Sequence, residues 1–156
     1  MSSKNEKHVR NICENRKARH DYHILETFEA GIVLLGSEVK ASRDGKANLN
    51  DSFITDENGE MYLLNCHISE YKGANRFNHE PKRKRKLLMK HKEINRLIGK
   101  IKQKGLTMVP LKMYFNSRNF IKVEVALVQG KANYDKREAI KERDWNREKQ
   151  RILKNK

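Results

Sequence analysis

A dense run of side-chain hydrogen-bond donors lies near the start of the chain, in the segment Asn15-Arg16-Lys17-Ala18-Arg19-His20. Amide, guanidinium, ammonium and imidazole donors of this kind bond to phosphates, 2′-hydroxyls and unstacked bases in RNA complexes. A polar arm before a first strand is also common in proteins that bind no nucleic acid. The run therefore suggests contact with RNA, and its weight depends on the rest of the chain.

Side chains that could carry catalysis are less organised. The sequence has no Walker A, G-x-G-x-x-G, H-E-x-x-H or G-x-S-x-G motif. Asp44, Asp51 and Asp56 fall in a turn and at strand ends, without the spacing of Mg²⁺ ligands. Cys13 and Cys66 form no C-x-x-C pair, which argues against zinc and favours two free thiols. We therefore expect no enzyme, no metal and no cofactor.

The positive charge of the chain is gathered in blocks. The formal net charge is +15, made up of −2 over residues 1–81, +10 over 82–104, +2 over 105–129 and +5 over 130–156. Charge concentrated in this way indicates a surface suited to a polyanion. The alternative is a solvated helix face, which is the ordinary explanation of a single charge run.

Apolar patterns predict the elements that would position these groups. Asn58-Gly59 predicts a tight hairpin, because both residues tolerate positive φ. Helices are predicted over 37–44, capped by Ser37, and over 82–104, with His91 on the apolar face. The six predicted strands are 22–27, 32–35, 49–54, 60–68, 107–114 and 120–127.

These elements predict a mainly β fold with helices. We expect a small closed antiparallel six-stranded barrel, similar to the oligonucleotide-binding fold, with two or three packed helices. Residues 1–14 would be a disordered arm, 15–129 the barrel domain, and 130–156 a basic tail that is disordered when free. No apolar run approaches the roughly 18 residues of a membrane span, and no signal peptide is recognised at the start. We therefore expect a cytoplasmic protein.

Several motifs occur together in a fixed order. Taken as a set, they make the chain resemble the SsrA-binding protein (small protein B) family of bacterial translation, over roughly Asn15 to Leu153. Beyond the donor run, the motifs are Phe28-Glu29-Ala30-Gly31-Ile32, Gly36-Ser37-Glu38-Val39-Lys40, Asn48-Leu49-Asn50-Asp51-Ser52-Phe53, Asn78-His79-Glu80-Pro81, Arg85-Lys86-Leu87-Leu88-Met89 and Gly130-Lys131-Ala132-Asn133-Tyr134-Asp135-Lys136-Arg137.

The resemblance implies an adaptor of trans-translation. Its barrel would bind the tRNA-like domain of transfer-messenger RNA, support aminoacylation, and deliver the RNA to stalled 70S ribosomes. Alanyl-tRNA synthetase and elongation factor Tu would be indirect partners through the RNA. The tail would fold into a helix in the decoding centre and the empty mRNA channel, which leads to tagging of the nascent peptide for degradation and release of the ribosome.

The same resemblance implies two sets of site residues. The RNA-binding set is Asn15, Lys17, Arg19, His20, Glu29, Glu38, Lys40, Leu88 and Lys122. The decoding-centre and tail set is Lys131, Tyr134, Asp135, Lys136, Arg137, Trp145, Ile152 and Leu153.

Three positions and a turn leave alternatives open. Glu29 could accept from a base amino group or hold a neighbouring arginine, or it could form an ordinary surface ion pair. Leu88 could instead be a core residue. The chain departs from the family pattern at Ala132, where many members have a lysine, and in the turn 116–119, which lacks a glycine often found there.

Two other functions fit a small basic chain. A structural ribosomal protein would share its size, charge and tail. An RNA-processing enzyme would require Asp44, Asp51 or Asp56 for cleavage. The motif set favours the adaptor over both.

Overall fold

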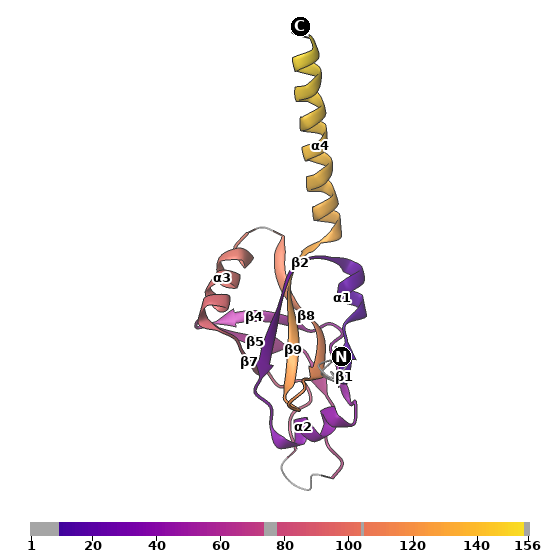
Figure 1. Cartoon of the computed structure of the whole chain (residues 1–156). Coiled ribbons are helices and arrows are strands. Elements are labelled where there is room, and N and C mark those ends of the chain that lie inside the picture. Colours follow the sequence, from indigo (N-terminus) through magenta and orange to yellow (C-terminus); the bar gives the residue numbers. More distant parts are fainter. Residues whose placement is uncertain (1–9, 74–77, 104, 155–156) are drawn as a thin grey trace, which may run out of the picture.

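The computed structural model describes residues 10–73, 78–103 and 105–154, with backbone only for 132–137. A ring of strands forms the body, three helices lie against it, and a fourth projects from it (Figure 1). The elements are β1 (Arg10–Glu14), α1 (Arg16–Asp21), β2 (Tyr22–Ile32), α2 (Gly36–Arg43), β3 (Ala47–Asn48), β4 (Phe53–Glu57), β5 (Glu60–Leu64), β6 (His67–Ile68), β7 (Arg85–Leu88), α3 (His91–Ile101), β8 (Leu106–Phe115), β9 (Ile121–Gly130) and α4 (Lys131–Lys154).

The main sheet closes on itself. Its ring runs β8–β4–β5–β7–β2–β9, and β9 pairs with both β2 and β8 to close it. All of these pairings are antiparallel, and β1 is added to β8 outside the ring. The predicted mainly β fold with helices is confirmed, and the ring has the closed antiparallel order that the sequence predicts.

The interior of the ring is apolar. Strand residues that alternate inward, such as Leu63, Leu87, Met113 and Val125, are fully buried there. Ile94 and Leu97 of α3 cover one opening of this core. Every second residue of the same strands therefore faces outward, and these outward residues are available for a binding surface.

The hairpin between β4 and β5 forms where the sequence predicts it. Asn58 and Gly59 both have positive φ, 53° and 78°, and they join strands that pair from Phe53–Leu64 to Glu57–Glu60. Two-residue turns of this hand match the twist of the flanking strands. The predicted strands at 107–114 and 120–127 are also confirmed, as β8 and β9.

The helix predicted over 82–104 is wrong in its first half. Residues 85–88 form β7, in which Arg85 and Leu87 point inward, and α3 starts only at His91. The spacing of apolar residues from Leu87 onward concealed this strand, because its inward position at 85 is charged. His91, expected on the apolar face, is exposed at the first turn of α3.

The start of the chain also differs from expectation. Arg10–Glu14, expected in a disordered arm, pair with β8, and residues 16–21 form the helix α1. The two strands predicted between Tyr22 and Leu35 are one strand, β2, and Val33 and Leu35 beyond it are exposed. Ser37 does not cap α2, since its hydroxyl contacts Nδ1 of His79 instead.

Residues 131–154, expected to be disordered in the free chain, form the single helix α4. None of the helices in the described ranges combines the length and the apolar character that crossing a membrane requires.

Candidate RNA-binding surface

Helix α1 is fixed to the outer face of the ring by Asn15. The Asn15 side chain accepts from the backbone N–H of Ala18 at 3.1 Å and donates to the carbonyl of Pro110 at 3.0 Å. It therefore caps the helix and ties it to β8. Ala18 packs on an outer apolar cluster that includes Leu111 and Ala126. Asn15 is 3 % exposed, and in this structure both of these bonds position the helix.

The remaining donors of the run are presented to solvent by α1. The Nζ atom of Lys17 lies 3.3 Å from Oδ1 of Asp51, and the Nη2 atom of Arg19 lies 3.6 Å from Oε1 of Glu124 in β9. His20 contacts its neighbour Asp21 at 3.0 Å. Such exposed pairs are weak and open easily, so these side chains can be redirected to RNA phosphates.

Glu29, Leu88 and Lys122 come together on the outer face of three neighbouring strands. Gly31 of β2 pairs with Leu88 on one side and with Lys122 on the other. A Cβ atom at Gly31 would lie 3.3 Å from Leu88 Cβ and 3.7 Å from Lys122 Nζ. The glycine therefore lets the two side chains approach each other. Together with Glu29 they line a hollow of about 510 Å³.

Leu88 is a surface residue. Its side chain is 52 % exposed, whereas Leu87 beside it is fully buried. The strand alternation of β7 explains the difference, because neighbouring residues point to opposite faces. The alternative that Leu88 belongs to the core is therefore excluded, and an apolar group is left on the outer face beside a cation.

Among the described residues, the partner of the Glu29 carboxylate is a hydroxyl and not an arginine. The Tyr114 hydroxyl donates to Glu29 Oε2 at 2.6 Å. Burial, this hydrogen bond, and the charges of Glu29 and Glu124 raise the pKa of Tyr114 above its ordinary value. The phenol stays protonated, and it orients the carboxylate while leaving Glu29 exposed to accept from a ligand.

Glu38, which the resemblance places in the RNA-binding set, is not on the surface of this fold. Its side chain is fully buried and receives hydrogen bonds from Arg85, from Arg83 at 2.6 Å and from the N–H of Leu35 at 2.7 Å. Burial alone would raise the pKa of Glu38, but the bonds from Arg83, Leu35 and Arg85 outweigh it, and the pKa is lowered.

Arg85 completes this buried network. It is fully buried, donates to the carbonyls of Cys66 and Pro81 at 2.7 and 3.1 Å, and is paired with Glu38. The network ties α2 to β7, which carries Leu88. Glu38 is therefore a positioning residue. Lys40 of α2 is exposed over the ring of Tyr71 at 5.5 Å, outside the hollow of Glu29, Leu88 and Lys122.

The basic block 82–104 carries less free charge than its sequence suggests. Acidic residues from the first half of the chain pair with it, as Glu57 does with Lys84, Glu60 with Lys86 at 3.8 Å and Glu26 with Arg96 at 2.7 Å. The slightly negative first half and the positive block thus neutralise each other in part across the sheet. Part of the positive charge of the block is therefore already balanced within the fold.

The tail residues are presented along α4. Lys131, Trp145, Ile152 and Leu153 are exposed, the last three at 66, 59 and 63 %. Apolar side chains this exposed on a helix indicate a surface that a partner would cover. The side chains of the other implied tail positions, Tyr134, Asp135, Lys136 and Arg137, lie outside the described residues.

Metal and thiol chemistry find no support in the described ranges. No group of His, Cys, Asp and Glu side chains there could hold a metal ion. Burial, with the neighbouring Cys66, raises the pKa of the Cys13 thiol to about 12, and burial raises that of Cys66 to about 11. Both thiols are therefore protonated and poorly nucleophilic.

Sequence reasoning missed Tyr114, Arg83 and Arg85 as partners of the site. The register between β8 and β9 could have indicated Tyr114. Once β8 and β9 are joined by the turn 116–119, Tyr114 pairs with Lys122 on the outer face. Nothing in the pattern indicates the inward arginine.

Comparison with known proteins gives a consistent result. The family model described as SmpB protein matches residues 12–155. An SsrA-binding protein of Wolbachia (strain wRi) is 58 % identical over 144 residues, which cover 92 % of this chain and 97 % of that protein. An SsrA-binding protein of Rhizobium johnstonii is 57 % identical over 143 residues, covering 92 % and 95 %.

A solved structure agrees with both. A chain of the structure described as "tmRNA-SmpB: a journey to the center of the bacterial ribosome" is 55 % identical and has a TM-score of 0.65, covering 76 % of this chain and 83 % of that one. Since the family model spans residues 12–155 and the curated relatives are 57 to 58 % identical over nearly their whole length, this chain belongs to the SmpB family of SsrA-binding proteins.

Proposed function

We propose that this protein is an adaptor of trans-translation, with a body that binds transfer-messenger RNA and a tail that acts on the stalled 70S ribosome. The relatives are named SsrA-binding proteins, and the solved neighbour is described with tmRNA and the bacterial ribosome. In this proposal the ring works as a small barrel of the oligonucleotide-binding kind, and it acts by binding without catalysis.

The convergence of Glu29, Leu88 and Lys122 at one hollow is the observation that carries the proposal. The three differ in chemistry: a carboxylate can accept from a base amino group, an exposed leucine can pack on a base or ribose, and an ammonium can bind a phosphate. A surface of this mixed kind selects a folded RNA by shape and does not simply attract any polyanion. The exposed donors Lys17, Arg19 and His20 on α1 extend it.

Helix α4 supplies the ribosomal part of the proposal. It leaves the ring after β9 and projects away from the body (Figure 1). In this function α4 occupies the decoding centre and the empty mRNA channel, with Tyr134 stacking on a base and Asp135, Lys136 and Arg137 acting at the decoding centre. Trp145, Ile152 and Leu153 anchor it there. Aminoacylation by alanyl-tRNA synthetase and delivery with elongation factor Tu follow indirectly, through the RNA that the body holds in shape.

The direct test is to recover the protein from cells and sequence the RNA that accompanies it. We expect one dominant small structured RNA, and the absence of such an RNA would overturn the proposal. Replacing Asp135, Lys136 and Arg137 with Ala should preserve binding of the tRNA-like domain and abolish peptide tagging, because only the ribosomal step uses them. A structural ribosomal protein would remain on subunits in high salt, whereas this adaptor should wash off.

A further inference from the structure

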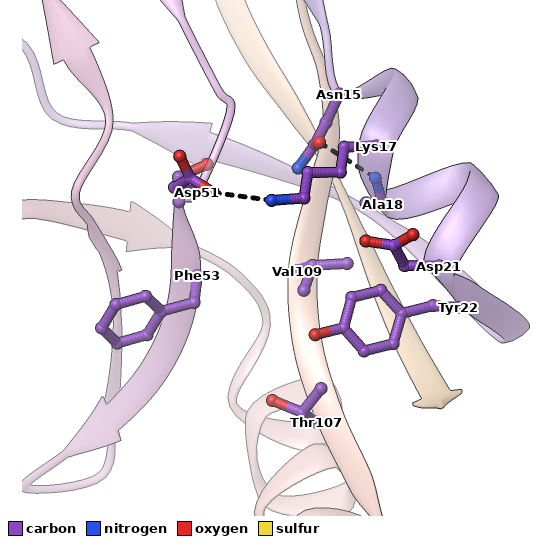
Figure 2. Close-up of a pocket in the computed structure, with 10 residues that line it drawn as sticks. Asn15, Lys17, Ala18, Asp21, Tyr22, Asp51, Phe53, Thr107 and Val109 are labelled. Carbon is purple, nitrogen blue, oxygen red and sulfur yellow. Dashed lines mark hydrogen bonds and ion pairs between the residues drawn. The ribbon is translucent and has the colours of Figure 1, made fainter. Parts of the chain in front are cut away.

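A second hollow, of about 320 Å³, lies between α1, the turn that leads into β4, and β8. It does not include Glu29, Leu88 or Lys122. In Figure 2 the rings of Phe53 and Tyr22 lie on opposite sides of it, with Val109 between them and the Lys17–Asp51 pair at its rim. Phe53 is 45 % exposed, so part of its ring is accessible to a ligand.

The turn that carries Asp51 is firmly built. Asp51 has a φ of 64°, the left-handed conformation that non-glycine residues adopt at a cost. The Asn65 side chain donates to the Asp51 carbonyl at 3.1 Å and helps to hold it there. Within the turn, the N–H of Asn50 donates to the Asn48 side chain at 2.7 Å and the N–H of Ser52 to the Leu49 carbonyl at 3.1 Å. These bonds hold the backbone of the turn, which places the Asp51 side chain at the mouth of the hollow.

We propose that this hollow receives an unpaired guanine of the bound RNA. The base would stack on Phe53 and place its two adjacent donors, N1–H and N2–H, on the Asp51 carboxylate. Guanine is the base whose Watson–Crick edge presents two donors side by side, which matches the two oxygens of a carboxylate. Unstacked RNA bases are commonly held by an aromatic face together with hydrogen bonds to this edge.

Lys17 makes the exchange possible. Its pair with Asp51 is exposed on both sides, with side chains 64 and 69 % exposed, so the pair is easily broken in water. When the base enters, the guanine donors replace the ammonium at the carboxylate, and Lys17 moves to the phosphate of the same nucleotide. In the free protein the Lys17–Asp51 ion pair therefore occupies the rim of the hollow, and it opens when the base enters.

The inference rests on the proposed function and names the base chemistry of a second contact. The test uses the tRNA-like domain as a transcript in which single guanosines are replaced by inosine, which lacks the N2 amino group. With the wild-type protein, we expect inosine at one unpaired position to weaken binding on the order of tenfold, the discrimination that one bidentate base contact provides.

Two pairs of variants make the test specific. Asp51→Asn should weaken binding by a similar factor and remove the sensitivity to inosine. Asp56→Asn, a nearby acid within β4 and outside the hollow, should keep it. Phe53→Leu should weaken binding, and Phe53→Tyr, which keeps the aromatic face, should not.

The source of the guanine is decided by a second arm. Kethoxal reacts with N1 and N2 of unpaired guanine. If the guanine belongs to the ribosome, a ribosomal guanine should be protected from kethoxal in complexes with the wild-type protein and should become reactive with Asp51→Asn. The inference is overturned if inosine is tolerated at every unpaired position and no ribosomal guanine is protected in an Asp51-dependent way. Failure of the wild-type protein to bind the unmodified transcript would instead count against the proposed function.

Discussion

The body and helix α4 differ in where their charged and apolar side chains lie. In the body, formed by the ring and the helices packed on it, basic residues such as Lys84, Arg85 and Arg96 are paired with acids from other strands and helices, and the apolar side chains are largely buried. Along α4, by contrast, Trp145 and Ile152 face solvent. In the proposed function this difference means that the body recognises its partner by a fixed arrangement of mixed groups, whereas the exposed apolar side chains of the tail are covered only when a partner binds.

Removal of α4 should give the largest effect. A chain ending at Gly130 keeps every buried residue of the ring, so it should bind the tRNA-like RNA within about twofold of the full chain. Tagging of stalled peptides should be abolished, because only the tail reaches the decoding centre in our proposal. Gel shifts and a tagging assay in a purified translation system measure the two effects. Equal loss of RNA binding and of tagging would contradict the division of roles between the body and the tail.

The next largest effect is expected in the stability of the ring. Glu38→Gln leaves Arg85 buried without its counter-charge, which should lower the free energy of unfolding by about 3–5 kcal/mol. Urea denaturation gives this value. Glu57→Gln is the matched control, because its pair with Lys84 is exposed and should contribute no more than about 1 kcal/mol. Similar losses in both variants would show that the buried network is not special.

The pH dependence of unfolding sharpens the same point. The pKa of Glu38 in the folded chain is lowered from its ordinary value of 4.5. Its contribution to stability is therefore fully present above about pH 4.5 and is lost as the pH falls through the lower pKa of the folded state. Glu38→Gln should remove this part of the loss of stability in acid. If the free energy of unfolding below pH 4.5 changes with pH as it does in the wild type, the assigned pairing of Glu38 with Arg85 is contradicted.

Leu87 and Leu88 offer a test with neighbouring residues. Leu87→Ala should cost about 2–5 kcal/mol of stability, because it leaves a cavity in the core. Leu88→Ala should change stability by less than about 0.5 kcal/mol and lower RNA affinity on the order of tenfold, since it removes an exposed apolar contact. Thermal unfolding and RNA titration separate the two, and a reversed pattern would place the site on the other face.

The smallest effect on the free protein is expected for Trp145→Ala. Its ring is 66 % exposed, so the melting temperature and RNA affinity should not change measurably. Tagging should slow on the order of tenfold if the ring is buried or stacked on the ribosome. A lower melting temperature would show that α4 is packed against the body in solution.

Much of the fold follows from local patterns. The Asn58-Gly59 hairpin and the alternation of β8 and β9 are specified by nearby residues, and both were predicted correctly. The strand β7 was missed because one of its two inward positions is Arg85, whose burial depends on Glu38, 47 residues earlier in the chain. Pattern rules that assume apolar inward residues cannot detect a strand whose interior position is a paired charge.

Only part of the site could be predicted, again because burial depends on contacts between residues that are distant in the sequence. The motifs identified Glu29, Leu88 and Lys122, and the strand pairings bring them together. Glu38 belonged to the same motif set, but its role is internal, since a motif does not distinguish a residue that contacts a ligand from one that holds the scaffold. Burial settles that question, and it depends on the tertiary packing.

The closure of the ring by β9 has a consequence for how the protein is made. β9 is the last strand to be synthesised, and it pairs with both β2 and β8. A nascent chain that stops before residue 121 therefore has two unpaired strand edges and no closed core, and such edges promote aggregation. Folding must wait for nearly all of the body to leave the ribosome, and long-range pairings of this kind form slowly. Unfinished copies of the chain should thus be targets for proteolysis rather than partly active fragments.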